Sequence, residues 1–451
     1  MSGATEELAR DLLSRAVRSG ATSADVIVRE GDEFTATVRM KQIESLKEAA
    51  SKVLGLRIFA GTRSASAYSQ DFSVHSLERL VERTLAMARA TSEDPASGLP
   101  AGDELGRWEG DLQLYDASVE KLSAEERIGW ARRAEEAALA TDSRIGNSEG
   151  STFEASTGTK VYANSLGFVG RYSSSYCGLS VVPVAANGPG TPMQRDYWYT
   201  VGRGVGALES PESVGRKAAE RAIRKLGARK ISTCRVPVVF DAECARSLAG
   251  HLFEAVRGDA IYRSASFLAG KLGERMAGEN VSLVDDGLRP GGFGSRPFDD
   301  EGIPAATTSV IERGVLKNYL LNTYAARKLN LKTTGNAARG VAGPPAIGPK
   351  NLYLAPGPHD PAEIVRSVNN GFYVTELIGF GVNIVTGDYS RGAAGLWIEN
   401  GELAYPVEEV TIAGCLPEML HNVAMIGSDL EFRSSIASPT LLVEGLTVAG
   451  T

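Results

Sequence analysis

The spacing of hydrophobic residues predicts an amphipathic helix near the start of the chain. Over residues 5–19, leucine, alanine and valine recur three or four positions apart, and Gly20 stands where a C-terminal cap belongs. The same spacing predicts a second helix over residues 74–90. Further along the chain, it predicts helices at 123–141, 211–226 and 241–256.

Alternation of apolar and polar residues predicts strands between these helices. In the first part of the chain the predicted strands are 24–29, 34–40, 54–60 and 64–69, the last two joined by a turn at Gly61-Thr62. Residues 145–206 are strand-like throughout, and an apolar strand begins at Val236. Two hairpins are predicted, with turns at Arg313-Gly314 and Asn400-Gly401, because such dipeptides favour tight turns.

These elements predict the α+β class, because strands and helices alternate without a regular β-α-β rhythm. An N-terminal α/β unit with a mixed sheet and helices is expected, followed by a C-terminal β-rich domain that is largely antiparallel. A chain of 451 residues needs more than one hydrophobic core. We predict domains at 1–91, 122–228 and 229–451, with the Gly/Pro-rich segment 92–121 as a linker.

Charge and composition argue against some classes of partner and indicate the cellular compartment. The net charge is −7 and no run of Lys or Arg occurs, which argues against nucleic-acid binding. No apolar stretch is long enough to span a membrane, and the acidic start does not resemble a signal peptide. The four cysteines lie far apart without a Cys-x-x-Cys pair, so we expect reduced thiols and a cytoplasmic protein.

The predicted helix 241–256 carries a histidine and a glutamate, His251 and Glu254. A zinc site on a helix needs a second histidine three to five positions further along, and none follows His251. A packed or surface histidine is therefore favoured over a metal ligand. Residues 202–207 match a dinucleotide fingerprint, but Glu209 stands between these glycines and the helix and, with Glu212, would repel a pyrophosphate. A glycine-rich turn is therefore favoured there. The chain contains no Walker A loop and no Gly-x-Ser-x-Gly elbow.

Two polar segments are candidates for binding. The acidic run Asp299-Asp300-Glu301 offers oxygen ligands to a divalent cation, or carboxylates to backbone amides or to Arg296; the structural role is favoured. The stretch from Leu331 to Pro345 is rich in Thr, Asn, Gly and Pro, as binding loops and lids often are. A disordered connector is an equally good interpretation of this second segment.

Several spaced segments together resemble the TldD/PmbA family, known as modulators of DNA gyrase, and its TldE/PmbA branch in particular. The resemblance is strongest from about residue 234 onward and is looser in the N-terminal half, where Leu56–Arg63 carries it. The segments that carry it in the C-terminal half are Gly292–Gly302, Tyr324–Leu329, Lys332–Asn336, Gly387–Gly395 and Ala437–Gly450.

The resemblance implies a two-subunit cytoplasmic zinc peptidase that cleaves unfolded or leader peptides. In its catalytic branch a His-Glu-x-x-x-His helix and a later cysteine hold zinc. Those three helix positions fall on Ala249, Gly250 and Glu254 here, and residues 426–439 contain no cysteine. The resemblance therefore implies a subunit without a metal of its own, paired with a zinc-bearing TldD-like subunit, or forming a homodimer when alone.

Polar side chains within the recognisable segments are the candidates for contact with a peptide. They can hold a peptide backbone or terminus. These candidates are Arg296, Asp299, Asp300, Thr334, Asn336 and Arg391. Two other functions stay open: a stand-alone hydrolase with an unrecognised site, and a peptide-binding or chaperone-like interaction module.

Overall fold

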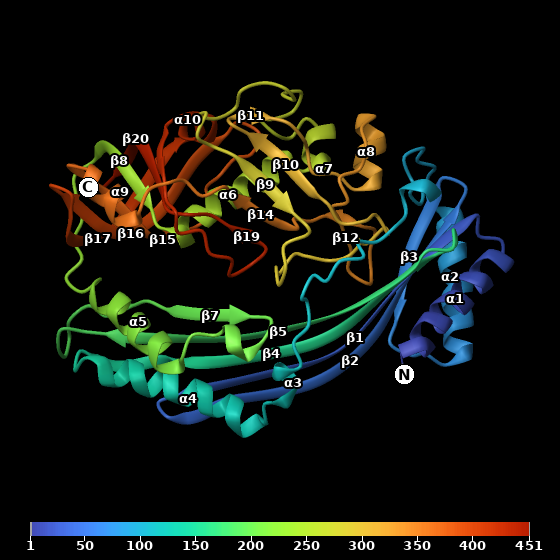
Figure 1. Cartoon of the computed structure of the whole chain (residues 1–451), viewed down its shortest axis with the longest axis horizontal. Coiled ribbons are helices and arrows are strands. Elements are labelled where there is room, and N and C mark those ends of the chain that lie inside the picture. The colour runs from blue at the N-terminus through green and yellow to red at the C-terminus, as the bar shows by residue number, and fades with distance from the viewer. Residues whose placement is uncertain (1, 451) are drawn as a thin grey trace.

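The computed structural model describes residues 2–450 and shows two layers of unequal shape (Figure 1). The N-terminal half forms a long, curved antiparallel sheet with helices on its outer face, and the C-terminal half forms a β-rich body across its inner face. The α+β class is thereby confirmed. Within residues 2–450, no helix combines the length and the apolar character that crossing a bilayer requires.

The long sheet takes strands from both sides of the segment 92–121. Its order is β3-β2-β1-β4-β5-β6, and β7 also pairs with β5. Strand β1 pairs with β2 on one side and with β4 on the other. The bounds are β1 Ser23–Arg39, β2 Gln42–Ala60, β3 Arg63–Ser69, β4 Ile145–Asn164, β5 Val169–Ala185, β6 Gln194–Arg195 and β7 Trp198–Gly202.

Two helix pairs cover the outer face of this sheet, one at each end. Helices α1 (Ser2–Arg18) and α2 (Val74–Ala90) pack on one end, and α4 (Ala124–Thr141) and α5 (Pro211–Ile223) on the other. Each pair has its own hydrophobic cluster. Ser73, Ser123 and Ser210 cap the N-termini of α2, α4 and α5 by accepting backbone N–H bonds. The short elements nearby are η1 Gly102–Glu104, α3 Ser118–Lys121 and η2 Val205–Ala207.

The C-terminal body consists of a small barrel, a second sheet and the helix α6 (Ala242–Val256) between them. The barrel sheet has the order β17-β16-β15-β8-β20-β18, and pairing of β17 with β20 closes it. Its strands are β8 Cys234–Phe240, β15 Asn370–Ile378, β16 Asp388–Glu399, β17 Glu402–Cys415, β18 Val423–Ile426 and β20 Leu441–Ala449. The second sheet, of order β11-β10-β9-β14-β19, contains β9 Leu283–Asp286, β10 Thr307–Glu312, β11 Val315–Leu316, β14 Asn351–Leu354 and β19 Ile436–Ala437.

The apolar face of α6 lies in the largest hydrophobic cluster of the C-terminal body, together with side chains of both sheets. The remaining short elements surround this core. They are α7 Gly258–Tyr262, α8 Thr323–Leu329, β12 Ala337–Ala338, β13 Ala346–Ile347, α9 Pro361–Ser367 and α10 Leu416–His421.

Both predicted hairpins are confirmed. Strands β10 and β11 meet at Arg313 (φ 45°) and Gly314 (φ 79°), and β16 and β17 meet at Asn400 (φ 52°) and Gly401 (φ 80°). Positive φ at both central residues matches the right-handed twist of the flanking strands, and asparagine and glycine adopt it at low cost. The turn at Gly61 (φ 66°) likewise joins β2 to β3.

The N-terminal strands are longer than the sequence pattern predicted. Strand β1 continues through Gly31, which pairs with Gly158 of β4 where a side chain would collide with the Thr157 carbonyl. The predicted strands 24–29 and 34–40 are therefore one strand, and Gly31 marks a close approach of β1 to β4. Strand β2 begins at Gln42, and its first half has polar residues exposed on both faces, so no alternation was visible.

Candidate functional site

The inner face of the long sheet meets the loops of the C-terminal body at a polar junction. On β1, Val26 and Val28 point to the helices, so Asp25, Ile27 and Arg29 point to the inner face. Ile27 packs there with residues of both halves. Two C-terminal loops, 296–304 and 333–348, approach this face and supply the other side of the junction.

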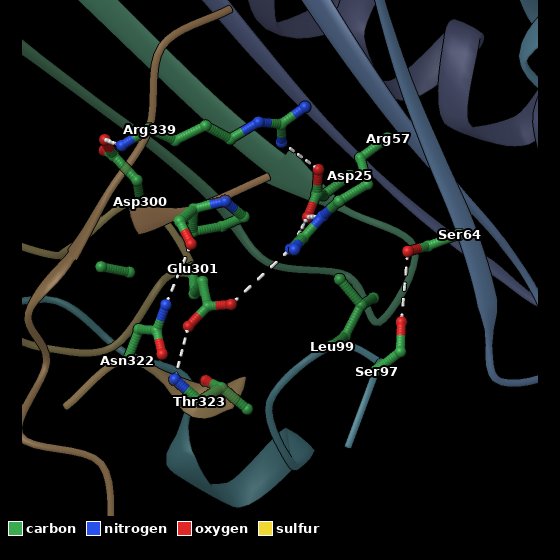
Figure 2. A network of polar contacts seen from close by, with 12 residues as sticks. Asp25, Arg57, Ser64, Ser97, Leu99, Asp300, Glu301, Asn322, Thr323 and Arg339 are labelled. Carbon is green, nitrogen blue, oxygen red and sulfur yellow. Dashed lines mark hydrogen bonds and ion pairs between the residues drawn. The ribbon is translucent and has the colours of Figure 1, made fainter. Parts of the chain in front are cut away.

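A buried network of charges lies at the centre of the junction. Asp25 is fully buried and accepts from Arg57 Nε at 2.8 Å, while its other oxygen pairs with Arg339 (Figure 2). Glu301, 2% exposed, lies 3.8 Å from Arg57 Nη2 and accepts from the Thr323 amide at 2.8 Å. Burial opposes the charge on Arg57, but the carboxylates of Asp25 and Glu301 outweigh it and raise the pKa of Arg57.

The predicted acids Asp299 and Asp300 are buried within a turn at this junction. Asp299 accepts from the amides of Glu301, Ile303 and Ala337 at 2.9–3.0 Å. Asp300 pairs with Lys160 of β4 and accepts from the Arg339 amide at 2.6 Å. Burial, followed by the charge of Glu301, raises the pKa of Asp299 to about 7. Asp299 thus accepts amides of its own turn, as favoured from the sequence, but both acids also bind the loop 333–348, and Asp300 pairs with Lys160 and not with Arg296.

Thr334 and Asn336 hold the neighbouring loop in place. Asn336 is fully buried and donates to Asp285 Oδ2 at 2.7 Å and to the Gly348 carbonyl at 3.0 Å. Thr334 donates to Asn336 Oδ1 at 2.7 Å. Lys350 Nζ donates to the Thr334 carbonyl at 2.8 Å. This part of the loop is therefore fixed by internal hydrogen bonds and is not a disordered connector.

The two arginines among the predicted contact residues lie apart. Arg296 is half-buried at the junction, and its Nε and Nη2 are buried without a hydrogen-bond partner in the described part of the chain. Arg391 lies on β16, beside His251, and donates to the Leu377 carbonyl at 3.3 Å. The structure thus brings Arg296, Asp299, Asp300, Thr334 and Asn336 together without Arg391. Contact with a peptide stays a prediction for all six.

His251 packs against Tyr389 across the barrel wall. Their ring centroids are 6.1 Å apart, and neither His251 Nε2 nor the Tyr389 hydroxyl has a hydrogen-bond partner among residues 2–450. Burial, and then the positive charge of Arg391, lowers the pKa of His251 to about 4. The imidazole is therefore neutral at physiological pH.

We expect this histidine to make the folded chain sensitive to acid. Because His251 binds a proton at about pH 6.5 when unfolded and only near pH 4 when folded, its contribution is complete above pH 6.5. That contribution falls as the pH drops from 6.5 toward 4. Urea unfolding at pH 7 and pH 5 should show a larger loss of stability for the wild type than for His251→Gln. Equal losses would contradict this assignment.

The positions that the resemblance matches to a zinc site do not form one here. Ala249 is fully buried in the hydrophobic cluster, and Gly250 has no side chain. Glu254 is exposed and pairs with Arg257 at 2.8 Å. Across residues 2–450, no group of three or more His, Cys, Asp or Glu side chains is arranged to hold a metal ion. The residues on α6 therefore do not fit zinc.

A cavity of about 400 Å³ opens at the junction, next to the charge network. Residues of β2, β3, the loop 91–98, α7 and the loop 344–347 line it, and Arg57 and Glu301 lie in its wall. Asp25, Arg57 and Arg339 were not predicted from the sequence as members of this site. One available signal was Asp25 itself, a charged residue inside the apolar strand segment Ala24–Val28.

Comparison with known proteins gives the family. Residues 24–88, 117–226 and 233–450 match, in order, domain 1, the central domain and the C-terminal domain of the PmbA/TldA metallopeptidases. The chain is 38% identical to metalloprotease PmbA of Escherichia coli O157:H7 over 428 residues, covering 95% of this chain and 92% of that protein. The chain belongs to the PmbA/TldD family. The family resemblance inferred from the sequence is thereby confirmed.

A further relative and two solved structures are also similar to this chain. The PmbA homologue of Haemophilus influenzae is 35% identical over 96% of this chain and 94% of its own length. A crystal structure described as a candidate modulator of DNA gyrase from Bacteroides thetaiotaomicron covers 99% of both chains with a TM-score of 0.92 at 28% identity. TldE of Thermococcus kodakarensis has the same fold, with a TM-score of 0.86 at 20% identity over 98% of this chain and all of its own.

Proposed function

We propose that this chain is the metal-free partner subunit of a two-subunit metallopeptidase that cleaves unfolded or leader peptides. The observation that carries the proposal is the lack of zinc ligands on α6. Ala249 is buried, Gly250 has no side chain, and Glu254 pairs with Arg257. Among the described residues, helix α6 therefore offers no set of ligands to zinc. Relatives of the chain are named metalloproteases. A peptidase built from this fold therefore needs its metal in another chain.

In a partner subunit, the polar junction would help to bind the peptide substrate. Arg296, with two buried and unpaired guanidinium nitrogens, has donors left for a peptide carbonyl or carboxylate. Asp299, Asp300 and Asn336 are buried and already bonded, so they are better suited to positioning the loop than to touching a ligand. The four cysteines are unpaired, which supports our proposal of a cytoplasmic location.

A partner of related fold explains why a chain with this architecture has an incomplete site. Two related subunits can dock through corresponding surfaces and form a nearly two-fold symmetric pair. We expect an obligate interface of roughly 2,000 Å² or more with an apolar centre. Without the zinc-bearing relative, the same surface would hold two copies of this chain together as a homodimer.

Mixing the chain with a TldD-like subunit from the same organism tests the proposal. We expect a 1:1 complex in native mass spectrometry and peptidase activity on an unfolded peptide that this chain alone does not show. Elemental analysis of the untagged chain should find well under one zinc per molecule. The proposal fails if the zinc-bearing subunit is fully active alone and no mixed species forms. Turnover by this chain alone would favour the stand-alone hydrolase instead.

A further inference from the structure

One carboxylate in the wall of the junction cavity, Glu301, has an oxygen that the described part of the chain leaves without a hydrogen bond. Glu301 Oε2 accepts from the Thr323 amide, but Oε1 accepts no hydrogen bond within residues 2–450. Its nearest cationic nitrogen, Arg57 Nη2, is 3.8 Å away, beyond hydrogen-bonding distance. Figure 2 shows Glu301 facing Arg57, with Ser64, Ser97 and Leu99 nearby. A carboxylate oxygen without a hydrogen-bond donor, on a side chain that is 2% exposed, gains most from a charged donor.

The other charges along the cavity wall are already paired. Arg57 uses Nε and Nη2 to bind Asp25, a carboxylate that Arg339 also contacts. Asp94 accepts from the Tyr324 hydroxyl at 2.7 Å and from Lys328 Nζ at 2.9 Å. Asp259 accepts two hydrogen bonds from Arg257, at 2.8 and 3.0 Å. Glu301 is therefore the carboxylate in the wall that is available to a ligand.

The rest of the wall suits a short and polar ligand. Hydroxyl groups of Thr62, Ser64, Ser92 and Tyr262 line the cavity and can bind peptide N–H and C=O groups without regard to side chains. Arg263, also in the wall, is exposed and forms no ion pair within the described part of the chain. Its guanidinium group can receive a carboxylate. The volume of about 400 Å³ lies within the range of small-molecule sites.

We propose that the junction cavity binds a short peptide with a free amino terminus, whose ammonium group donates to Glu301 Oε1. The hydroxyl groups then hold the peptide backbone, and Arg263 takes the carboxyl terminus. The inference extends the proposed role in peptide handling. Because it concerns the chain alone, without a zinc-bearing subunit, it can fail while the partner role stands, and the reverse is also true.

Calorimetric titration of the purified chain with three probes tests both ends of the ligand. The probes are trialanine, N-acetyl-trialanine and trialanine amide. We expect trialanine to bind, acetylation to weaken binding at least roughly tenfold, and amidation to weaken it by a smaller factor. Equal binding of acetylated and free trialanine, or binding of neither to the folded chain, would overturn the proposal.

Variants of the two wall residues assign the contacts. Glu301→Gln should weaken trialanine binding at least roughly tenfold and leave N-acetyl-trialanine unaffected. Arg263→Gln should weaken trialanine but not trialanine amide. Glu312→Gln, an exposed carboxylate on β10, is the matched control and should change nothing. If Glu301→Gln does not fold, the comparison of acetylated and free peptide on the wild type still decides the question.

Discussion

Replacing Asp25 by alanine is expected to lower the free energy of unfolding by about 3–5 kcal/mol. Asp25 is fully buried and is the carboxylate that Arg57 and Arg339 both contact. Without it, two buried guanidinium groups would share only Glu301, which lies 3.8 Å from Arg57. Arg339 Nη2 already lacks a hydrogen-bond partner within residues 2–450. Without Asp25, the guanidinium group of Arg339 would therefore have few partners left.

Urea denaturation at neutral pH measures this loss, and an exposed acid provides the control. Asp11 pairs with Arg15 at 2.8 Å on the surface of α1, and Asp11→Ala should cost less than about 1 kcal/mol. Replacing the whole group, with Asp25→Leu, Arg57→Met, Arg339→Met and Glu301→Gln together, should recover much of the lost stability. A loss below about 1 kcal/mol in Asp25→Ala would show that the network does not hold the two halves together.

Local signals in the sequence were sufficient for the five longer helices, α1, α2, α4, α5 and α6, and for the tight turns. The α2 and α4 helices carry a serine cap and an apolar stripe within a few residues of each other, and both were predicted close to their observed bounds. The turns at Gly314 and Gly401 depend only on the conformations of two residues. Such signals act over short distances, so they remain visible in a single sequence.

The junction could not be predicted in this way, because its contacts join distant parts of the chain. Asp25 and Arg339 are 314 residues apart, and no spacing rule connects them. Arg57 lies within a segment that carried the family resemblance, but nothing in that segment identifies its partner. The sequence did point to Asp299 and Asn336, in two separate polar segments, as candidates for contact with a peptide. Their burial and their bonds to backbone groups became visible only in the structure.

The second large effect is expected from Gly294→Ala, in the loop that leads to Arg296. A β-carbon at Gly294 would lie 1.8 Å from the Lys350 carbonyl oxygen, and backbone cannot move aside as a side chain can. The Gly294 amide also donates to Asn351 Oδ1 at 2.9 Å, which fixes the loop against β14. We expect a loss of about 3 kcal/mol in the free energy of unfolding, at the upper end of the usual cost of overpacking, because the loop must shift.

Gly250→Ala is the matched control, with an expected effect of opposite sign. Gly250 lies inside α6, and a β-carbon there would meet no atom within 4 Å. Alanine should therefore stabilise the chain by about 0.5–1 kcal/mol, because glycine loses more backbone entropy in a helix. Thermal and urea unfolding of both variants give the comparison. If the two substitutions change stability alike, backbone packing at Gly294 is not what constrains this loop.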